Sequence, residues 1–444
     1  MNEIVQLQAP THIELSITER CNHKCRHCYN SFRSSGGRRC SMSKEQAGKI
    51  LKQLEAACVG YVTLTGGEPL MDQDLLFYMI DNLRKRNIGV GLNSNLTLMT
   101  NAILERLKEL DFNNTILTSL PGFTSETCDE TTQSPGSFSR IRNGIQMCRN
   151  AGVRVCVNVV VTKKNLCQLK DLIPFLIETP VDGVAITKVV PPCHSSSVSD
   201  YVFSKTDVLA MLDFMQHIRE KLHYPVTSLC AIPWCLAESQ EQIKGLSTKC
   251  AAGIVSCAIN AISGSVTPCA HNEKSFGCIY EESLGAIWNR MFEYRTLDIL
   301  PAACKSCKML YKCGGECRLI RSRNTTQKYH LKSIENLEID GPDNHNDASY
   351  VQKAGLLQIS PFVRFREEAF GGVISIGPHE FYVKRKLFEY IKDLKTRDIF
   401  TFDDIKGEME MNKVASQIIQ TMIELGVFVM VNDLQHEGII IQHN

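Results

Sequence analysis

Residues 13–29, IELSITERCNHKCRHCY, join an alternating apolar stretch to a loop with three cysteines. The alternation over 13–17 predicts a β-strand, and the loop follows its carboxyl end, where barrel folds carry their chemistry. A cubane iron–sulfur cluster normally takes four thiolates, so three in one loop indicate a cluster with one open iron. Zinc is the alternative, because His23 or His27 could supply a fourth ligand. The three thiols belong to Cys21, Cys25 and Cys28.

The spacing C-x3-C-x2-C, with an aromatic residue before the third cysteine, resembles the signature of the radical S-adenosylmethionine (SAM) enzymes. The resemblance implies that the open iron chelates the amino and carboxylate groups of SAM. It also implies that one electron from the cluster cleaves SAM to methionine and a 5′-deoxyadenosyl radical, which abstracts hydrogen from the substrate. His27, the aromatic residue, would then lie near the adenine.

The composition excludes several classes of protein. The 444 residues have room for two or three domains, and 49 Lys and Arg balance 48 Asp and Glu, so no global field favours nucleic acid or an anionic membrane. We see neither a signal peptide nor an apolar run of about 18 residues. The 20 cysteines, gathered at short spacings, favour thiolates as metal ligands in the reducing cytoplasm.

Strand-like and helix-like segments alternate from about residue 12 to 225. Such βα repeats predict an α/β fold with a parallel sheet wrapped by helices. Periodicity fits an open sheet or a barrel, but the radical SAM resemblance implies a partial (β/α)6 TIM-like barrel with an open side. A capping box at 43–46 is predicted to start the first helix. The predicted strands are 12–18, 60–65, 88–93, 114–119, 153–161 and 183–190.

A Gly-Gly-Glu-Pro segment at 66–69 follows the second predicted strand. Glycine lets a backbone approach a ligand closely, and a carboxylate there can pair with an ammonium group. The radical SAM resemblance implies that this segment contacts the amino group of the bound methionine, whereas an ordinary turn is the alternative. The residues are Gly66, Gly67, Glu68 and Pro69.

Softer resemblances extend this SAM site. Ser119, at the end of the fourth strand, would lie near the SAM ribose. Arg140 would reach the SAM carboxylate, a task that suits a planar guanidinium, although a solvated helix arginine is the alternative. Weaker candidates follow the third strand, namely Asn93, Ser94 and Asn95.

A second cysteine-rich region has the pattern C-x2-C-x5-C-x3-C over 304–317, with Gly-x4-Cys upstream over 264–269. It resembles the SPASM extension, which carries auxiliary iron–sulfur clusters in radical SAM enzymes that modify peptides and proteins. Zinc is the alternative for the C-x2-C pair. The resemblance implies that the first auxiliary cluster is held by Cys250, Cys257, Cys269 and Cys317. It gives the second cluster three ligands, Cys304, Cys307 and Cys313.

The family pattern needs one more cysteine after Cys317, and the sequence has none there. Three alternatives follow for the fourth ligand of the second cluster. One iron stays open, or a linker side chain binds it, from Asp343, His345 or Asp347. The third alternative borrows a cysteine from Cys230, Cys235 or Cys278.

The last hundred residues contain no cysteine and predict a small α+β domain. A hairpin over 362–383, turning near 371–372 or 377–378, precedes helices near 384–396, 402–409 and 413–425. This order resembles the winged-helix peptide-recognition module related to the pyrroloquinoline-quinone chaperone, where a precursor's leader adds a strand beside the hairpin. DNA binding is disfavoured because no dense basic stripe occurs, and a domain that only packs is the alternative.

Together these features predict a radical SAM partial barrel over 1–225, a SPASM domain over 226–347 and a winged-helix-like domain over 348–444. The first hypothesis is an enzyme that modifies a ribosomally made precursor peptide, bound through its leader, forming a thioether or carbon–carbon crosslink. It would draw on an external one-electron reductant. The alternatives are a sulfatase-maturing enzyme that makes formylglycine, and a non-catalytic iron–sulfur protein, which would have no use for a SAM pocket.

Overall fold

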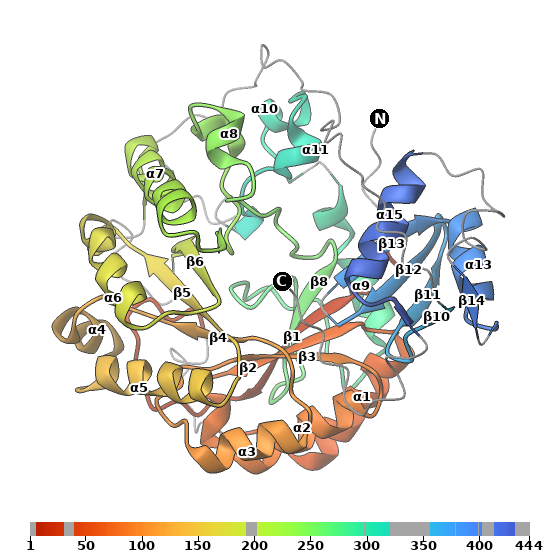
Figure 1. Cartoon of the computed structure of the whole chain (residues 1–444), viewed down its shortest axis with the longest axis horizontal. Helices are drawn as coiled ribbons and strands as arrows, with labels where there is room; N and C mark the ends of the chain where they lie inside the picture. Colours follow the sequence, from red (N-terminus) through yellow and green to blue (C-terminus); the bar gives the residue numbers. More distant parts are fainter. Residues whose placement is uncertain are drawn as a thin grey trace. The chain divides into compact units, whose positions relative to one another are not determined.

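The structure is a computed structural model (Figure 1), and the chain divides into two compact units that are described separately. The first comprises residues 1–84 and 90–335, and the second 85–89 and 336–444. No helix among the described residues is long and apolar enough to cross a membrane. The structure describes residues 6–30, 40–191, 202–296, 299–319, 356–377, 379–397, 399–401 and 413–430.

The first unit is built on a nine-stranded sheet with the order β7-β6-β5-β4-β3-β2-β1-β8-β9. From β1 to β6 strands alternate with helices that lie outside the curved sheet (Figure 1), so the predicted partial barrel is confirmed. Its strands are β1 (His12–Thr18), β2 (Tyr61–Gly66), β3 (Gly89–Asn93), β4 (Ile116–Ser119), β5 (Val155–Val161) and β6 (Gly183–Lys188). Its helices are α1 (Lys44–Ala56), α2 (Gln73–Arg84), α3 (Asn101–Glu109), α4 (Ser125–Thr132), α5 (Ser137–Asn150), α6 (Leu172–Glu178) and α7 (Lys205–Lys221).

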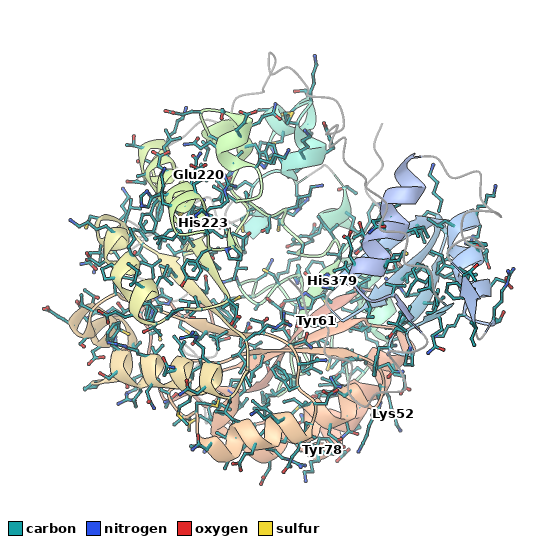
Figure 2. All side chains as sticks on the ribbon, viewed as in Figure 1. Lys52, Tyr61, Tyr78, Glu220, His223 and His379 are labelled. Atoms are coloured by element: carbon teal, nitrogen blue, oxygen red, sulfur yellow. The ribbon has the colours of Figure 1, made fainter. Side chains whose placement is uncertain are left out.

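The two faces of the sheet differ in chemistry. On β5, four valines alternate with partly exposed residues and are fully buried, at positions 155, 157, 159 and 161. The partly exposed face is more polar: Thr187 donates to Asn158 Oδ1 at 2.8 Å, and His12 Nε2 lies 2.9 Å from Thr63 Oγ1. Tyr61, labelled in Figure 2, packs edge-on against His12. The buried face therefore stabilises the barrel, and the other face carries groups that can bind ligands.

The helix that follows β1 begins where the sequence predicts. Ser43 accepts a hydrogen bond from the backbone N–H of Gln46, whose side chain accepts in return from the N–H of Ser43. This reciprocal capping satisfies two backbone donors that the first turn of a helix leaves unpaired. The buried stripe of α1 then packs on the sheet through Ile50 and Leu54.

The sheet extends beyond the predicted strands at both edges. The short β7 (Val226–Thr227) pairs with β6, and β8 (Ser256–Asn260) runs parallel to β1, with β9 (Val266–Thr267) antiparallel to β8. None of these three strands is among those predicted from the sequence, and two of them have only two residues each, too few to show a period. The remaining helices of this region are α8 (Gln240–Ile243), α9 (Leu284–Arg290), α10 (Ala302–Lys305) and α11 (Leu310–Cys313).

The second unit contains two small antiparallel sheets with the orders β11-β12-β13 and β14-β10-β15. The predicted hairpin is a three-stranded meander, because the chain turns at both suggested places. Two of the three predicted helices are present, and the third, 402–409, lies outside the described residues. The elements are β10 (Leu356–Ile359), β11 (Arg364–Glu368), β12 (Gly371–Ile376), β13 (His379–Lys384), α13 (Arg385–Leu394), β14 (Phe400–Thr401), α15 (Lys413–Glu424) and β15 (Phe428–Met430).

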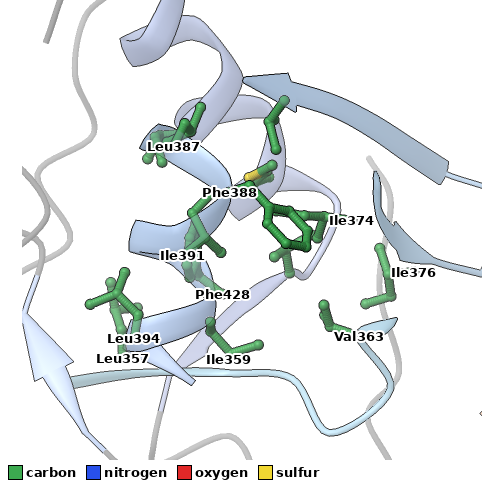
Figure 3. Close-up of a cluster of buried hydrophobic side chains, with 14 of the residues drawn as sticks. Leu357, Ile359, Val363, Ile374, Ile376, Leu387, Phe388, Ile391, Leu394 and Phe428 are labelled. Atoms are coloured by element: carbon green, nitrogen blue, oxygen red, sulfur yellow. The ribbon is translucent and has the colours of Figure 1, made fainter. Parts of the chain in front are cut away.

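A single apolar core holds this second unit together (Figure 3). Phe388 of α13 is fully buried at its centre, beside Ile374 of β12 and Ile391 of its own helix. The ring lies so close to the sheet that a Cβ atom on Gly372 would come within 2.1 Å of it. Helix α13 therefore packs on β12 through the ring of Phe388, which lies over Gly372. The division of the whole chain into three domains stays a prediction.

We expect Phe388→Ala to destabilise the second unit by about 3–5 kcal/mol, because truncating a buried aromatic side chain leaves a cavity. Hydrogen exchange of the α13 amides during a urea titration measures this loss. Phe362→Ala is the matched control, since that ring is 45 % exposed and its removal should change little. Equal protection of α13 in both variants would contradict the docking role of Phe388.

Candidate active site

The cysteine loop, residues 19–30, leaves the carboxyl end of β1. The backbone N–H of Cys28 donates to the carbonyl of Cys25 at 3.2 Å, and that of His23 approaches Cys21 Sγ at 3.4 Å. The loop thus turns tightly around its three partly exposed thiols. Every cysteine in the described residues is a free thiol, and the thiolate is the form that binds metal. The donor set therefore fits an iron–sulfur cluster.

Two glycines after β2 bring the cysteine loop against the sheet. The N–H of Gly67 donates to the carbonyl of Thr18 at 2.6 Å, and Asn30 Nδ2 donates to the carbonyl of Gly66 at 2.8 Å. A Cβ on Gly66, where φ is +141°, would lie 2.4 Å from the Thr18 oxygen, and one on Gly67 2.1 Å from the Arg20 oxygen. The backbone of the cysteine loop thus occupies the space where side chains at these two positions would lie. The predicted contact of this segment with the amino group of SAM stays a prediction.

Glu68 joins the ends of two neighbouring strands. Its carboxylate is buried and accepts hydrogen bonds from Ser94 Oγ at 2.7 Å, from the N–H of Asn95 at 2.7 Å and from the N–H of Leu70 at 3.0 Å. Burial raises the pKa of Glu68, and these hydrogen bonds oppose the shift. Asn95 Nδ2 donates onward to Asn22 Oδ1 at 2.9 Å, within the cysteine loop. The carboxylate therefore positions the loop ends around the thiols.

The far side of the cysteine loop rests on α4. The N–H groups of Lys24 and Arg26 donate to the carbonyls of Thr132 and Thr131, at 2.9 and 3.0 Å. The last carbonyls of a helix lack intrahelical donors, so this end of α4 can accept hydrogen bonds from another segment. These backbone contacts hold the loop on both sides of Cys25, the middle cysteine of the triplet.

The other predicted SAM contacts differ in their placement. Pro69 begins a 3-10 helix beside Glu68, and Ser119 ends β4, partly exposed, opposite Asn158 of β5. Burial lowers the pKa of His27 to about 4, so its ring is neutral near pH 7. The structure does not bring Arg140 to these residues: it is exposed on α5 and donates to its own N-terminal turn, at the Pro135 carbonyl and Ser134 Oγ. This geometry favours the solvated arginine.

Tyr29 connects the cysteine loop to the second cysteine region. Its ring centre lies 4.6 Å from that of His271, and its hydroxyl lies 3.2 Å from Thr65 Oγ1. Burial raises the pKa of Tyr29, and the neighbouring Glu14 raises it further. Glu14 itself accepts a hydrogen bond from the N–H of Ala270 at 3.2 Å. The 269–271 segment therefore lies against β1, next to the cysteine loop.

Three of the four cysteines predicted for the first auxiliary cluster are neighbours. The pKa of Cys269 is raised by burial and then by Cys317, Glu14 and Cys250, so these thiols lie close enough to interact electrostatically. Cys257 is buried on β8 opposite Ile13 of β1, and its pKa is raised by burial and then by the same Glu14 that acts on Cys269. The predicted ligand set is thus only partly brought together.

The three cysteines predicted for the second auxiliary cluster line one pocket. Cys235 lines it as well, and the N–H of Trp234 approaches Cys313 Sγ at 3.4 Å. In the described part of the chain, no three His, Cys, Asp or Glu side chains are arranged to hold a single metal ion. The thiolates of a cubane bind different irons, so a cluster does not require convergence on one point. The linker candidates at 343, 345 and 347 lie outside the described residues.

We expect Gly67→Ala to prevent cluster binding in the cysteine loop, because the added methyl group would displace the Arg20 carbonyl. Anaerobically reconstituted protein should lose about four irons per chain and its affinity for SAM. Gly48→Ala is the control, since nothing lies within 4 Å of that position on α1. Full iron content in Gly67→Ala would show that the loop tolerates a shift at this contact.

Two segments of the chain match known protein families. Residues 15–176 match the radical SAM superfamily, and residues 250–314 match SPASM, an iron–sulfur cluster-binding domain. The first range runs from β1 into α6 and contains the cysteine loop with its glycine contacts. The second contains all but one of the cysteines predicted to bind auxiliary clusters, Cys317.

Two kinds of curated relative align with most of the chain. The AdoMet-dependent heme synthase of Oleidesulfovibrio alaskensis is 23% identical over 322 residues, 69% of this chain and 82% of that protein. The mycofactocin maturase MftC of Mycobacterium tuberculosis is 27% identical over 347 residues, 76% of this chain and 83% of that protein. The alignments therefore extend well beyond the radical SAM segment.

Solved structures share the fold at low sequence identity. Native anSMEcpe with bound AdoMet superposes with a TM-score of 0.58 at 18% identity, covering 73% of this chain and 93% of that one. Streptococcus suis SuiB bound to the precursor peptide SuiA gives a TM-score of 0.57 at 18% identity, covering 74% and 77%. The radical SAM domain binds a [4Fe–4S] cluster and SAM, and the SPASM domain binds auxiliary iron–sulfur clusters. The chain is an enzyme in which a radical SAM domain is followed by a SPASM domain.

Proposed function

We propose that this enzyme modifies a ribosomally made precursor peptide. A [4Fe–4S] cluster with an open iron, when bound by the cysteine loop, supplies the electron that cleaves SAM. The chain's own part is to hold that site in place through Gly67 and Glu68, with His27 and Ser119 proposed to face the adenine and the ribose. The observation that best supports the proposal is the contact between the rings of Tyr29 and His271. Tyr29 belongs to the cysteine loop, and His271 lies two residues after Cys269, a candidate auxiliary ligand.

A peptide substrate is supported by two independent features. Mycofactocin maturase is among the relatives of the chain, and SuiB, which shares the fold, has been solved with its precursor peptide. The second unit supplies a candidate recognition element, since β11 and β13 are the outer strands of its meander. A leader peptide could add a further strand at β13, as in the winged-helix peptide-recognition modules that the sequence resembles.

The auxiliary region is proposed to accept the electron that a crosslinking reaction leaves on the substrate. Forming a thioether or carbon–carbon bond removes two hydrogens from the peptide. The 5′-deoxyadenosyl radical takes one as an atom, and the other leaves as a proton and an electron. An external one-electron reductant starts each cycle. The cytoplasmic location inferred from the cysteine content stays a prediction.

Other substrates remain candidates because of the relatives. The heme synthases align with 69% of the chain, and a sulfatase-maturing enzyme would use the same kinds of cluster. Neither reaction explains a separate C-terminal unit with a six-residue outer strand such as β13. We therefore rank peptide modification first, and the second unit provides the test.

Removing residues 348–444 should weaken binding of the cognate precursor peptide by about 100-fold, since several backbone hydrogen bonds to β13 would be lost. Fluorescence anisotropy of the labelled peptide measures the affinity. SAM cleavage without peptide should persist, because every candidate cluster cysteine precedes 348. A leaderless peptide is the control and should bind both forms equally. Unchanged affinity for the full precursor would show that the second unit only packs.

Cys304→Ala should abolish peptide modification and leave SAM cleavage measurable. The physical reason is that cleaving SAM needs only the cysteine loop, whereas an oxidised product must dispose of an electron. Mass spectrometry of the peptide and chromatography of 5′-deoxyadenosine separate the two outcomes. Cys167→Ala, at an exposed cysteine of the barrel, is the matched control. Peptide modification at the normal rate in Cys304→Ala would limit the second cluster to a structural role.

A further inference from the structure

We infer that the segment 230–235, CAIPWC, supplies one thiolate to each auxiliary cluster, Cys230 to the first and Cys235 to the second. The inference deepens the proposed function, because it completes the ligand sets of the same two clusters. It assigns a role to a segment that precedes the matched SPASM range, 250–314. Each half rests on a different observation.

The assignment of Cys235 rests on the pocket around the second cluster. This pocket is lined by Cys304, Cys307 and Cys313, the thiols of the C-x2-C-x5-C pattern, and by Cys235. The hydrogen bond from the N–H of Trp234 to Cys313 Sγ fixes the neighbouring backbone at the rim. No cysteine follows residue 317 in the sequence, so a fourth thiolate must come from upstream. Cys235 is the thiol that the fold places there.

The other upstream candidate is placed differently. Cys278 pairs as an isolated bridge with Ser265, and its Sγ lies 3.9 Å from the carbonyl of Ser263, at the β8–β9 turn. It does not line the pocket. The rest of the pocket wall is largely apolar, which would exclude water from a cluster and help set its reduction potential. Those residues are Pro233, Trp234, Ala303, Met309, Leu310 and Gly315.

The assignment of Cys230 rests on its contact with Cys317. Both belong to one small cluster, in which Cys230 is buried with Val190 and Leu319 and Cys317 packs against them. The side chains of Cys230 and Cys317 therefore lie in one packed group, and Cys250 is close enough to Cys230 to act on it electrostatically. Cys250 and Cys317 also act on Cys269. Four thiols thus gather where the first auxiliary cluster is proposed.

The register of β8 excludes Cys257 from this group. Cys257 stands opposite the fully buried Ile13, whereas Ala258 stands opposite Glu14. Successive side chains of a strand point to opposite faces of the sheet. Glu14 faces the auxiliary region, because it accepts a hydrogen bond from Ala270, next to Cys269. Cys257 consequently points into the core on the other face, as Ile13 does.

A buried ion pair adds support beside Cys317. Lys188 at the end of β6 and Glu316 lie 3.5 Å apart, and each is only 1 % exposed. Glu316 directly precedes Cys317 in the chain, so this ion pair ties the end of β6 to the backbone beside that cysteine.

The test compares single variants of the full chain after anaerobic reconstitution, with iron and acid-labile sulfide counted per chain and the reduced clusters examined by electron paramagnetic resonance. Cys235→Ala should have the same iron content and spectrum as Cys304→Ala. Cys230→Ala should likewise have the same iron content and spectrum as Cys269→Ala. Each should lose about four irons or change the spectrum of one cluster. Cys278→Ala and Cys257→Ala are the matched controls, and both should keep their iron and their spectra.

Serine variants serve where an alanine variant does not fold. Cys230→Ser and Cys235→Ser should keep the fold, judged by circular dichroism, and shift the spectrum of one cluster because oxygen replaces sulfur at one iron. Unchanged iron and spectra in a Cys230 or Cys235 variant would overturn that half of the inference. Loss of a cluster in Cys257→Ala would also overturn the Cys230 assignment. These measurements use no peptide, so their outcome is separate from that of the proposed function.

Discussion

The candidate site depends on the backbone contact between the cysteine loop and the two glycines after β2. Gly66 and Gly67 have no side chain, and the chain that leaves β1 occupies the space where one would lie. The resulting hydrogen bonds fix the thiols relative to the sheet, and Glu68 extends the same contact to β3. Without this contact the cysteine loop would lose its hydrogen bonds to the end of β2. Cluster binding would then have to offset the conformational entropy lost when the loop is ordered.

Burial of polar groups is the second constraint. Glu68 is buried among hydrogen-bond donors, and Lys188 is buried against Glu316, so each has partners that offset the loss of water. Burial also raises the pKa of thiols in the auxiliary region, such as Cys269 and Cys313, so their thiolate form is disfavoured in the protein alone. A cluster would supply the positive charge that makes the ionised form stable.

The alternation of strand and helix patterns predicted a parallel α/β sheet, and the resemblance of the cysteine triplet to the radical SAM signature implied the partial barrel. The sequence could not predict β8, whose pairing with β1 joins residues about 240 positions apart. The same limit applies to Cys257, since spacing along the chain does not say which face of a strand a thiol occupies. Arg140 donates to its own helix start in the structure, and its contact with the SAM carboxylate stays a prediction.

The pairing of β8 with β1 has a consequence for synthesis on the ribosome. β1 is an interior strand of the sheet, yet its partner on one side is made only after residue 256 has been translated. Translation adds about 5–20 residues per second, so β8 is synthesised roughly 10–50 seconds after β1. Trp288, whose indole N–H donates to the carbonyl of Leu7, is synthesised later still. The nascent barrel therefore has an unpaired strand edge at β1 until the auxiliary region emerges.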